Sequence, residues 1–441
     1  MPVHPLPYPG NEAAFVTALA RELPEVAWLD SGAGYGRYSI VAADPRVLIS
    51  SQHGQAWRRE RGTSSYRVAE DPMLCLRREL AAGEAEGPPP FAGGGIGYFG
   101  YDLGERWAGI ERQASSAMSE MAVGVYDWAV VRDHRYGTSW LAGPAANADL
   151  AAWLRERHQS EPPRGRYRVG EPSVDLGNAA YAQAFDRLRQ YIREGDCYQV
   201  NLARCFSAPF DGDALAAYRH LRQYSPSPYG AYLALGQGEV LSLSPERFLT
   251  LRDGRVETRP IKGTRARGKT ASTDAALRHE LAASTKDRAE NVMIVDLLRN
   301  DLGRVCRPGT VRVPELFAIE SYATVHHLVS TVTGELTAGS DAIELLRATL
   351  PGGSITGAPK RRAMEIIAEL EPSRRGVYCG SLGYLGYDGA MDTSIAIRTA
   401  LRCGQRLEYR AGGGIVWDSE RDAEMAETAS KARAFLDFLA P

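Results

Sequence analysis

Short β-rich runs separated by glycine-rich turns dominate the first part of this chain of 441 residues. Two examples are the segment WLDSGAGYGRYSIVAADP, residues 28–45, and the segment FAGGGIGYFGYDLGERW, residues 91–107. Runs bounded by turn residues in this way predict β-strands joined by short connections. We therefore expect residues 1–165 to build a mixed, mostly antiparallel sheet.

A polar stretch divides the chain. Residues 157–176, RHQSEPPRGRYRVGEPSVDL, contain three prolines and show no apolar periodicity, which is typical of a linker or a crossing loop. We place a domain boundary there, between an amino-terminal region, residues 1–165, and a second region, residues 175–441.

Helices and strands are mixed in the second region. An apolar stripe with spacings of four, three and four residues predicts a helix that Gly195 can end; it consists of Tyr181, Phe185, Leu188 and Ile192. A long helix is expected at about residues 275–300, and a final helix after Ser419, which has capping-box-like spacing with Asp422. Together the two regions predict an α/β (α+β) fold in which large mixed, mainly antiparallel sheets pack with helices.

The charge balance and the lack of long apolar runs exclude two classes of partner. The chain has 52 basic and 54 acidic side chains and a formal charge of −2, so it lacks the excess positive charge that nucleic-acid binding requires. No apolar run approaches the roughly 18 residues that cross a bilayer, so a membrane span is not expected. The six cysteines form no CxxC pair and the amino terminus MPVHPLPYPG lacks the features of a signal peptide, so we expect a cytoplasmic protein with reduced thiols.

Lysine is scarce in this chain. Only five of the 52 basic side chains are lysines, at positions 262, 269, 286, 360 and 431. A GC-rich genome accounts for such a bias without any functional cause. Even so, a lysine amine can lose its proton near neutral pH and act as a nucleophile, whereas an arginine cannot.

Two pairs of acidic residues have helical spacing. Glu424 and Glu427 stand three residues apart in the expected final helix, and Asp287 and Glu290 have the same spacing in the earlier one, so each pair projects from one side of its helix. If the two pairs face each other across a cleft, their oxygens suit Mg²⁺, which also takes oxygen from an anionic substrate. Two solvated acidic faces are the alternative, and the spacing alone leaves both open.

Two glycine-rich segments and one arginine are candidates for binding an anion. PGGSITGAPK, residues 351–360, offers backbone N–H groups ahead of Pro359, which suits the first turn of a helix. It lacks the GK[ST] ending of a nucleoside-triphosphate loop. AGGGIVWD, residues 411–418, lets a ligand approach the backbone, and Arg398, in a strand-like segment, suits bidentate capture of a carboxylate. Plain tight turns and a structural ion pair are the alternatives.

These segments, taken in order with their neighbours, resemble the chorismate-utilising enzymes, which include anthranilate, aminodeoxychorismate, isochorismate and salicylate synthases. The resemblance is strong over about residues 178–435 and rests on SPERF, RPIKGT, KDRAENVMIVDLLRNDLGRV, HHLVSTVTGEL, PGGSITGAPK, GSLGYLGYDGAMDTSIAIRT and GGGIVWDS. YFGYDLGERW and MAVGVYDWAV extend it into the amino-terminal region. It implies the fold of that family, with a chorismate-binding catalytic region at 175–441 after an amino-terminal region of the anthranilate-synthase type.

The resemblance also implies the residues of the site. Mg²⁺ would bridge the helix carboxylates and the ring carboxylate of chorismate, with Glu290 and Glu427 as principal ligands and Glu424 and Asp287 beside or behind them. Arg398 and Gly414 would hold the enolpyruvyl carboxylate. The other positions that would surround the substrate are Gly263, His327, Ser354, Tyr378 and Gly413.

Two positions, Gln199 and Lys262, imply the branch of the family. Isochorismate and salicylate synthases use a lysine base where this chain has Gln199, and a neutral amide cannot abstract a proton from water. Anthranilate synthases have alanine where this chain has Lys262, which instead matches the aminodeoxychorismate synthases. In those enzymes the lysine amine is thought to attack C2 while the 4-hydroxyl leaves, and Glu246 of SPERF matches the general acid. Ammonia would then displace the lysine and give 4-amino-4-deoxychorismate, on the route to 4-aminobenzoate and folate.

Alternatives stay open at this point. For Lys262 the alternative is a permanently charged amine that offsets substrate charge, and for Glu246 it is a salt bridge to a nearby arginine, Arg247 or Arg259. For the whole chain the alternatives are the large subunit of anthranilate synthase and a catalytically silent regulatory subunit. The latter is considered because relatives bind tryptophan in the amino-terminal region, and Ser31 and Pro228 lie in segments that resemble that pocket.

The source of ammonia is a further expectation. The chain contains no glutaminase segment with a nucleophilic cysteine. Ammonia is therefore expected from a separate glutamine amidotransferase subunit or from solution.

Overall fold

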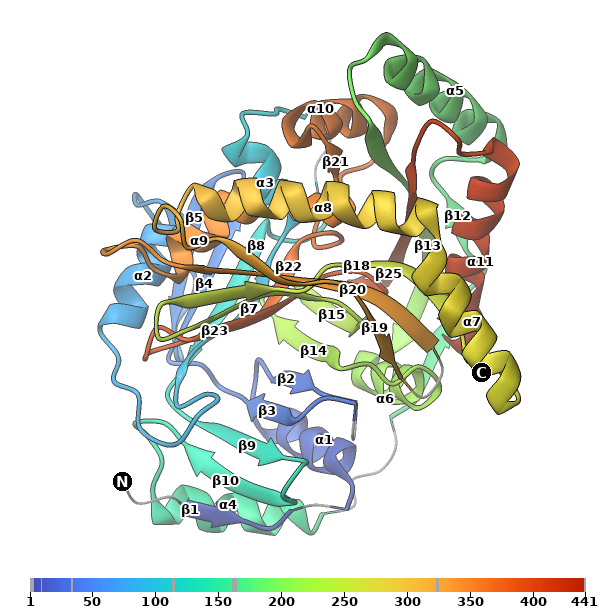
Figure 1. The fold of residues 1–441 in the computed structure, drawn as a ribbon. Helices are drawn as coiled ribbons and strands as arrows, with labels where there is room; N and C mark the ends of the chain where they lie inside the picture. The colour runs from blue at the N-terminus through green and yellow to red at the C-terminus, as the bar shows by residue number, and fades with distance from the viewer. Residues whose placement is uncertain are drawn as a thin grey trace.

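Two large antiparallel sheets form the centre of the protein (Figure 1). The computed structural model describes residues 4–8, 10–32, 35–112, 116–160, 165–322 and 325–439. The first sheet has the strand order β1 His4–Leu6, β10 Thr138–Ala142, β9 Ala129–Asp133, β3 Tyr38–Ala42, β2 Ala27–Asp30, β14 Tyr229–Leu235, β15 Gly238–Ser244, β24 Thr399–Cys403, β25 Arg406–Ile415, β13 Gln199–Gly212 and β11 Tyr167–Val169. Two short strands, β12 Ser173–Val174 and β21 Gly357–Ala358, also pair with β13.

The second sheet lies against the first. Its strand order is β18 Ile261–Ala266, β20 Val325–Glu335, β17 Arg255–Thr258, β16 Arg247–Arg252, β23 Met391–Ile395, β22 Ser381–Gly386, β7 Gly94–Phe99, β8 Met121–Tyr126, β4 Val47–Gln52, β5 Gln55–Glu60 and β6 Tyr66–Val68, and β19 Arg312–Ser321 pairs with β20. Both sheets are antiparallel throughout these pairings. The expected mixed fold with mainly antiparallel sheets is confirmed.

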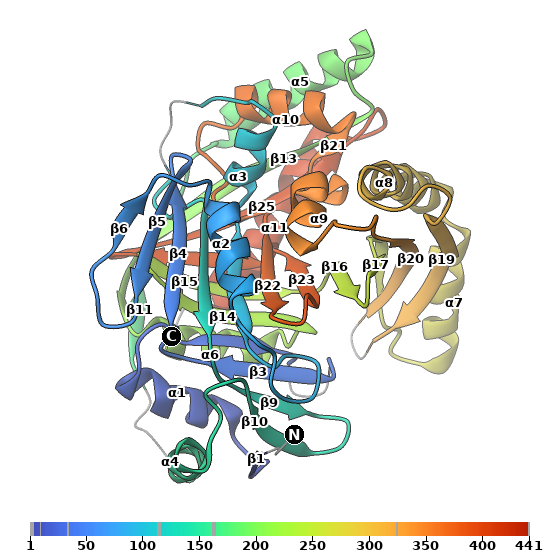
Figure 2. The same ribbon diagram turned by 90° about the vertical axis from the view of Figure 1, so that its left-hand side faces the viewer.

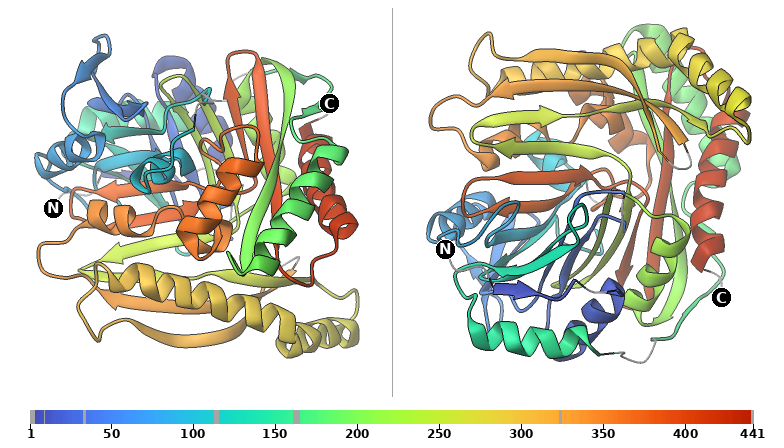
Figure 3. Two further views of the ribbon diagram at one scale, coloured as in Figure 1. Left: turned by 90° about the horizontal axis from the view of Figure 1, so that it is seen from above. Right: turned by 60° about the horizontal axis from the view of Figure 1, so that its bottom comes forward.

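Helices cover the outer faces of the two sheets. They are α1 Glu12–Glu22, α2 Pro72–Ala81, α3 Tyr101–Trp107, α4 Ala148–His158, α5 Asn178–Glu194, α6 Ala214–Tyr224, α7 Ala271–Ala283, α8 Thr285–Gly303, α9 Ala342–Thr349, α10 Lys360–Leu370 and α11 Arg421–Leu439, with a 3₁₀ turn η1 at Gly353–Ile355. In Figure 1, α8 lies over the strands β18 and β20 and extends roughly along them, and Figure 2 shows it end-on beside β19 and β20. Figure 3 shows α5 and α11 side by side next to β13 and β25. No helix in the described part of the chain is long and apolar enough to span a membrane.

Three apolar layers hold these elements together. Neighbouring residues of a strand point to opposite faces of the sheet, and accordingly Ile40 of β3 joins the layer between the two sheets while Val41 joins the layer under α1, α4, α6 and α11. In the layer between the sheets, Ile40 and Leu233 of the first sheet share a cluster with Ile96 and Leu382 of the second. The third layer lies between the second sheet and helices that include α2, α8 and α9.

Strands from both sides of the polar stretch share each sheet. The strand β2 pairs with β14 in the first sheet, and β7 pairs with β22 in the second. The polar stretch is expected to be a linker or a crossing loop, but it contains the short strands β11 and β12, which pair with β13. The division into residues 1–165 and 175–441 stays a prediction.

Two helix predictions need correction. The expected helix at 275–300 is two helices, because Ser284 adopts an extended conformation and its hydroxyl accepts a hydrogen bond from the Asp287 N–H, which begins α8. Ser419 and Asp422 form no capping box, since the Ser419 hydroxyl donates to Glu424 and accepts from the Val416 N–H. The predicted helix that ends at Gly195 is confirmed as α5, with Gly195 at φ +85°.

Candidate active site

Lys262 lies in a bulge of β18. The pairing of β18 with β20 shifts between Ile261 and Thr264, so that Lys262 and Gly263 are accommodated where the partner strand has one residue. Such a bulge redirects a side chain out of the regular alternation. Gly263 has φ +94°, and a Cβ there would lie 2.9 Å from Cγ of Asp287, so glycine is needed both for the backbone conformation and for the approach of α8.

The Lys262 amine reaches the glycine-rich loop. Its Nζ donates to the carbonyl oxygen of Ser354 at 3.1 Å, and Asn201 Nδ2 approaches the same oxygen at 3.4 Å. Burial lowers the pKa of Lys262, while the negative charges of Glu246 and Glu290 act in the opposite direction. The amine is therefore held in a setting that favours its neutral form more than water does.

Glu246 lies beside this amine, between β15 and β16. Its side chain is 6% exposed and hydrogen-bonds to the Ser354 side chain and the Ile261 backbone. Burial raises the pKa of Glu246 to about 7, although Lys262 and both hydrogen bonds favour the carboxylate. Such a carboxyl group can donate a proton near neutral pH.

The arginines proposed as salt-bridge partners of Glu246 are engaged elsewhere. Arg247 binds Asp392 at 3.2 Å, and Arg259 binds Glu320. The alternative in which Glu246 serves only in a salt bridge to one of them is therefore wrong.

The two acidic pairs approach one another from α8 and α11. Burial raises the pKa of Glu290, and the charges of Asp287 and Glu424 add to this. Burial likewise raises the pKa of Glu424, and Glu427 adds to it. Like charges disfavour each other's ionised form, so Glu290 of α8 and Glu424 of α11 lie close enough for their charges to interact, whereas the Glu427 side chain is 56% exposed.

One member of each acidic pair forms an ion pair with a basic side chain. Glu427 binds Lys431 at 2.7 Å and Asp287 binds Arg265 at 3.1 Å. Among the described residues, no three His, Cys, Asp or Glu side chains are grouped closely enough to hold a metal ion. The donor set is nevertheless hard oxygen, and the mutual repulsion of Glu290 and Glu424 is what a divalent cation would relieve, so these residues fit Mg²⁺.

His327 lies beside Thr264, and Arg398 is close enough for its charge to act on the imidazole. His327 Nδ1 lies 2.9 Å from the Thr264 hydroxyl, and burial together with the charge of Arg398 lowers the pKa of His327 to about 4. The imidazole is therefore neutral at physiological pH. Arg398 was expected in a strand, but it lies between β23 and β24 at φ +49°, where its backbone leaves the extended conformation.

The Arg398 side chain is exposed. Its guanidinium has no hydrogen bond or ion pair to any residue that the structure describes, so the alternative of a structural ion pair is not found within those ranges. A guanidinium without such partners can donate two parallel hydrogen bonds to a carboxylate.

The remaining predicted residues border the same region. A Cβ on Gly414 would lie 2.6 Å from Nε2 of Gln199, and one on Gly413 would lie 3.0 Å from Oε2 of Glu424. Tyr378 follows α10 in a turn; it is 7% exposed, and burial raises the pKa of its phenol well above the usual range. A side chain at Gly414 would therefore displace the Gln199 amide, and one at Gly413 would touch the end of the Glu424 side chain.

Sequence reasoning missed the polar residues that support this site. Asn201 approaches the Ser354 carbonyl, Thr264 orients His327, and a buried ion pair of Arg375 and Glu371 holds backbone groups nearby. None of these residues carries a spacing signal, because their partners lie far away in the chain.

Ser31 and Pro228 line a separate cavity of about 210 Å³ between the two sheets. Asp30 also lines it and is held by Arg222 at 2.9 Å and by Tyr218 at 3.1 Å. The structure thus brings the two residues of the expected tryptophan pocket together. What binds in the cavity stays a prediction.

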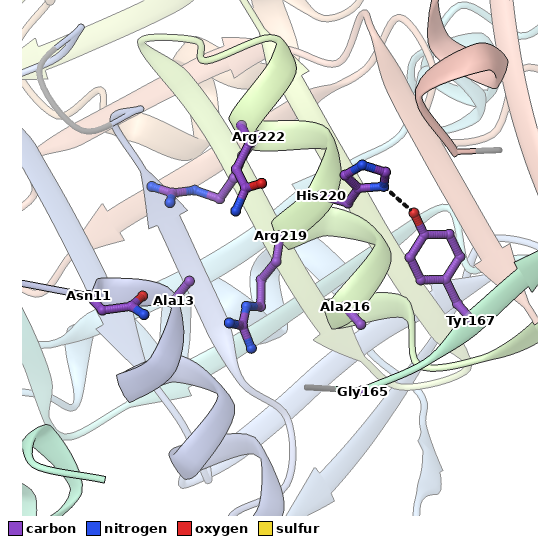
Figure 4. A pocket seen from close by; sticks show the side chains of 9 residues that line it. Asn11, Ala13, Gly165, Tyr167, Ala216, Arg219, His220 and Arg222 are labelled. Carbon is purple, nitrogen blue, oxygen red and sulfur yellow. Dashed lines mark hydrogen bonds between the residues drawn. The ribbon is translucent and has the colours of Figure 1, made fainter. Parts of the chain in front are cut away.

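A further cavity of about 260 Å³ contains none of the predicted site residues. Figure 4 shows Arg219, Arg222 and His220 of α6 around it, with Asn11 facing them and Tyr167 hydrogen-bonded to His220. Arg222 is the same side chain that binds Asp30, so this ion pair lies between the two cavities.

Comparison with known proteins finds relatives that match nearly the whole chain. A Klebsiella aerogenes protein named aminodeoxychorismate synthase component 1 is 45% identical over 442 residues, which cover 98% of this chain and 97% of that one. Anthranilate synthase component 1 of Cereibacter sphaeroides is 40% identical over 90% of this chain and 85% of its own. The crystal structure of anthranilate synthase component I from Streptococcus pneumoniae superposes with a TM-score of 0.79 at 31% identity, covering 91% of this chain and 92% of that one.

The family signature spans nearly the whole sequence. The model of the chorismate binding enzymes matches residues 24–437, which include Glu246, Lys262, the glycine-rich loop and both acidic pairs. The chain belongs to the chorismate-binding enzymes.

Proposed function

We propose that this chain catalyses the amination of chorismate at C4 with ammonia, giving 4-amino-4-deoxychorismate for 4-aminobenzoate and folate synthesis. The observation that carries the proposal is the pairing of a half-buried lysine amine with a buried carboxyl group whose pKa is about 7, both hydrogen-bonded to Ser354. The similarity to relatives named aminodeoxychorismate synthase component 1 supports it.

Lys262 acts as the nucleophile and Glu246 as the acid. The neutral Lys262 amine attacks C2, the C1–C2 and C5–C6 double bonds move to C1–C6 and C4–C5, and the C4–O bond breaks. Glu246 passes its proton to the leaving hydroxyl, which departs as water. The burial that lowers the pKa of Lys262 and raises that of Glu246 favours the protonation states that this step needs.

Ammonia completes the exchange at C4. It forms a C4–N bond, the double bonds return to their original positions, and Lys262 leaves from C2 with its electron pair. The Glu246 carboxylate then takes the surplus proton from the new ammonium group. Chorismate and ammonia are thereby converted to 4-amino-4-deoxychorismate and water, and both side chains return to their starting states.

The substrate carboxylates are bound by cationic groups. Arg398, with its uncommitted guanidinium, holds the enolpyruvyl carboxylate near Gly414. Glu290 and Glu427 would hold Mg²⁺, with Glu424 and Asp287 beside or behind them. Bound there, Mg²⁺ would supply positive charge for the ring carboxylate and offset the repulsion among these acidic side chains. His327, Tyr378, Gly263 and Gly413 enclose the ring.

A separate glutamine amidotransferase subunit supplies ammonia in this proposal. The name "component 1" of the relatives supports a partner protein. The cavity that contains Ser31 and Pro228 is the proposed tryptophan site, and an intact Lys262 and Glu246 argue against a purely regulatory chain.

Product identification tests the proposal. The purified protein is incubated with chorismate, Mg²⁺ and an ammonium salt. The product is separated by chromatography and identified by mass spectrometry. We expect 4-amino-4-deoxychorismate, lost in Lys262→Ala and retained in the matched control Lys269→Ala, whose lysine lies outside the site. Formation of anthranilate instead would identify an anthranilate synthase, in which ammonia reacts at C2, and would reject the assignment.

A further inference from the structure

Arg375 is a fully buried arginine that binds four acceptors. Its Nε and Nη2 donate to the two carboxylate oxygens of Glu371 at 2.9 and 2.6 Å. Its Nη1 donates to the carbonyl of Ile355 at 3.0 Å, and Nη2 donates also to the carbonyl of Asn201 at 2.9 Å. One guanidinium therefore joins the turn after α10 to two other segments of the chain.

Both carbonyls belong to residues beside the catalytic pair. Ile355 directly follows Ser354, whose carbonyl accepts from Lys262 Nζ and whose hydroxyl bonds to Glu246. Asn201 sends its side-chain amide toward the same Ser354 carbonyl, at 3.4 Å. The guanidinium thus holds two backbone carbonyls close to the Ser354 oxygen that Lys262 binds. One belongs to Ile355, the residue after Ser354, and the other to Asn201, whose side chain approaches that oxygen.

Glu371 strengthens the same attachment. Its Oε1 accepts from the Ala203 N–H at 2.9 Å, so the ion pair holds β13 at two places. The Tyr101 ring of α3 covers the guanidinium, with the arginine Cζ 4.7 Å from the ring centroid. Every charged atom of the pair is therefore committed, and neither side chain reaches solvent.

Stability alone does not call for such an arrangement. Removing two charges from water is costly, and a well-packed apolar pair is often as stable as a buried ion pair. The planar arginine fork also fixes geometry in a way that a single ammonium group cannot. Four directed hydrogen bonds from one rigid group hold backbone positions to within narrow limits.

We propose that Arg375, supported by Glu371, is a positioning residue that holds the Ser354 segment and β13 in the register that orients Lys262 toward Glu246. It acts through Ser354 and Asn201 and does not touch the substrate. The effect on turnover rests on the proposed function, whereas the effect on the Lys262 amine does not.

Arg375→Lys is the decisive variant, because it retains the positive charge and cannot make all four bonds. Arg132→Lys is the matched control: Arg132 is equally buried and pairs with Glu12 at 2.8 Å, far along the chain from the catalytic residues. Both variants replace a buried arginine that pairs with a carboxylate, so Arg132→Lys controls for the general effect of changing a buried arginine away from the site.

Two measurements are made on each variant. The first is kcat and KM for chorismate with ammonium salt. The second is the pH dependence of Lys262 acylation by a small amine-reactive acylating agent in the absence of substrate. Mass spectrometry measures the acylated fraction of the peptide that contains Lys262. Because the chain has only five lysines, this peptide is readily distinguished.

We expect kcat of Arg375→Lys to fall about tenfold or more with KM little changed, and the midpoint of Lys262 labelling to move upward as the amine becomes better solvated. Arg132→Lys should change neither. An unchanged labelling midpoint in folded Arg375→Lys overturns the proposal. If that variant does not fold, Glu371→Gln decides by the same midpoint. A wild-type chain without amination activity would reject the proposed function and leave the labelling result valid.

Discussion

Replacing Glu246 with glutamine tests the acid of the proposed reaction. The carboxyl group is 6% exposed, and burial raises its pKa from 4.5 to about 7. A shift of this size means that the folded site disfavours the carboxylate by roughly 3 kcal/mol relative to water. Glu246 therefore keeps its proton below about pH 7 and loses it as the pH rises through that value.

Lys262 imposes the opposite requirement. Its amine must be neutral to attack, and burial lowers its pKa. The active state of the pair thus carries one proton, on Glu246. Activity should fall at low pH, where the pair holds two protons, and at high pH, where it holds none, which gives a bell-shaped profile that belongs to the pair.

Glutamine keeps the size of the side chain and removes its titrating proton. We expect kcat of Glu246→Gln to fall by about 10²–10⁴, the usual contribution of a general acid, which is roughly 3–5 kcal/mol in the barrier. The descending limb above about pH 7 should vanish, so that the residual activity rises with pH and then levels off. Initial rates are measured against pH at a constant concentration of free ammonia.

Glu315→Gln is the matched control, since Glu315 lies on β19 and its side chain is 59% exposed. It should retain the bell-shaped profile and the wild-type rate. A descending limb that persists in Glu246→Gln would assign that limb to another group. The reasoning from the buried carboxyl would then be refuted.

Three further outcomes are expected. Glu290→Gln and Glu427→Gln should each abolish turnover at every Mg²⁺ concentration while the circular-dichroism spectrum is unchanged; near-normal activity in both would reject the metal assignment. Lys262→Arg should be nearly as impaired as Lys262→Ala, and the wild type incubated with chorismate and Mg²⁺ but no ammonia should carry a chorismate-derived mass on the Lys262 peptide; an active arginine variant without an adduct would reduce the lysine to a counter-charge. The isolated chain should use ammonium salts and should use glutamine only after the amidotransferase subunit is added, so glutamine use by the chain alone would contradict the proposed division of labour.

The helix break at Ser284 illustrates a signal that the sequence contained. Ser284 stands three residues before Asp287, the spacing of a helix start, and Thr270 and Thr273 have a similar relation at the start of α7. The apolar and charged residues around Ser284 fit one continuous helix equally well, so their periodicity does not distinguish one helix from two. The acidic pair of α8 could be predicted because the spacing survives within the second helix.

Arg398 shows where local pattern misleads. The alternating residues around it suggest a strand, but Arg398 has φ +49° and lies between β23 and β24, directly before Thr399, and not within a regular strand. Residues 399–403 do continue as β24. A single left-handed residue cannot be read from alternation, because alternation describes side chains and not the path of the backbone.

Arg375 could not be identified from the sequence at all. Its partners are Glu371, Ile355 and Asn201, and two of these lie in other segments of the chain. Lys262 and Glu246, by contrast, lie within short motifs, and the resemblance to a family carries such motifs directly. Contacts between Arg375 and backbone groups of distant segments can be identified only from the folded structure.

The order of strands in the second sheet has a consequence for synthesis of the protein on the ribosome. The strand β7 pairs Phe99 with Ser381, so its partner β22 is made long after β7 itself. At elongation rates of about 5–20 residues per second, the edge of β7 waits roughly 15–60 s for that partner. During this interval the nascent chain exposes an apolar strand edge of the kind that templates aggregation, and chaperone binding to the growing chain should be concentrated there.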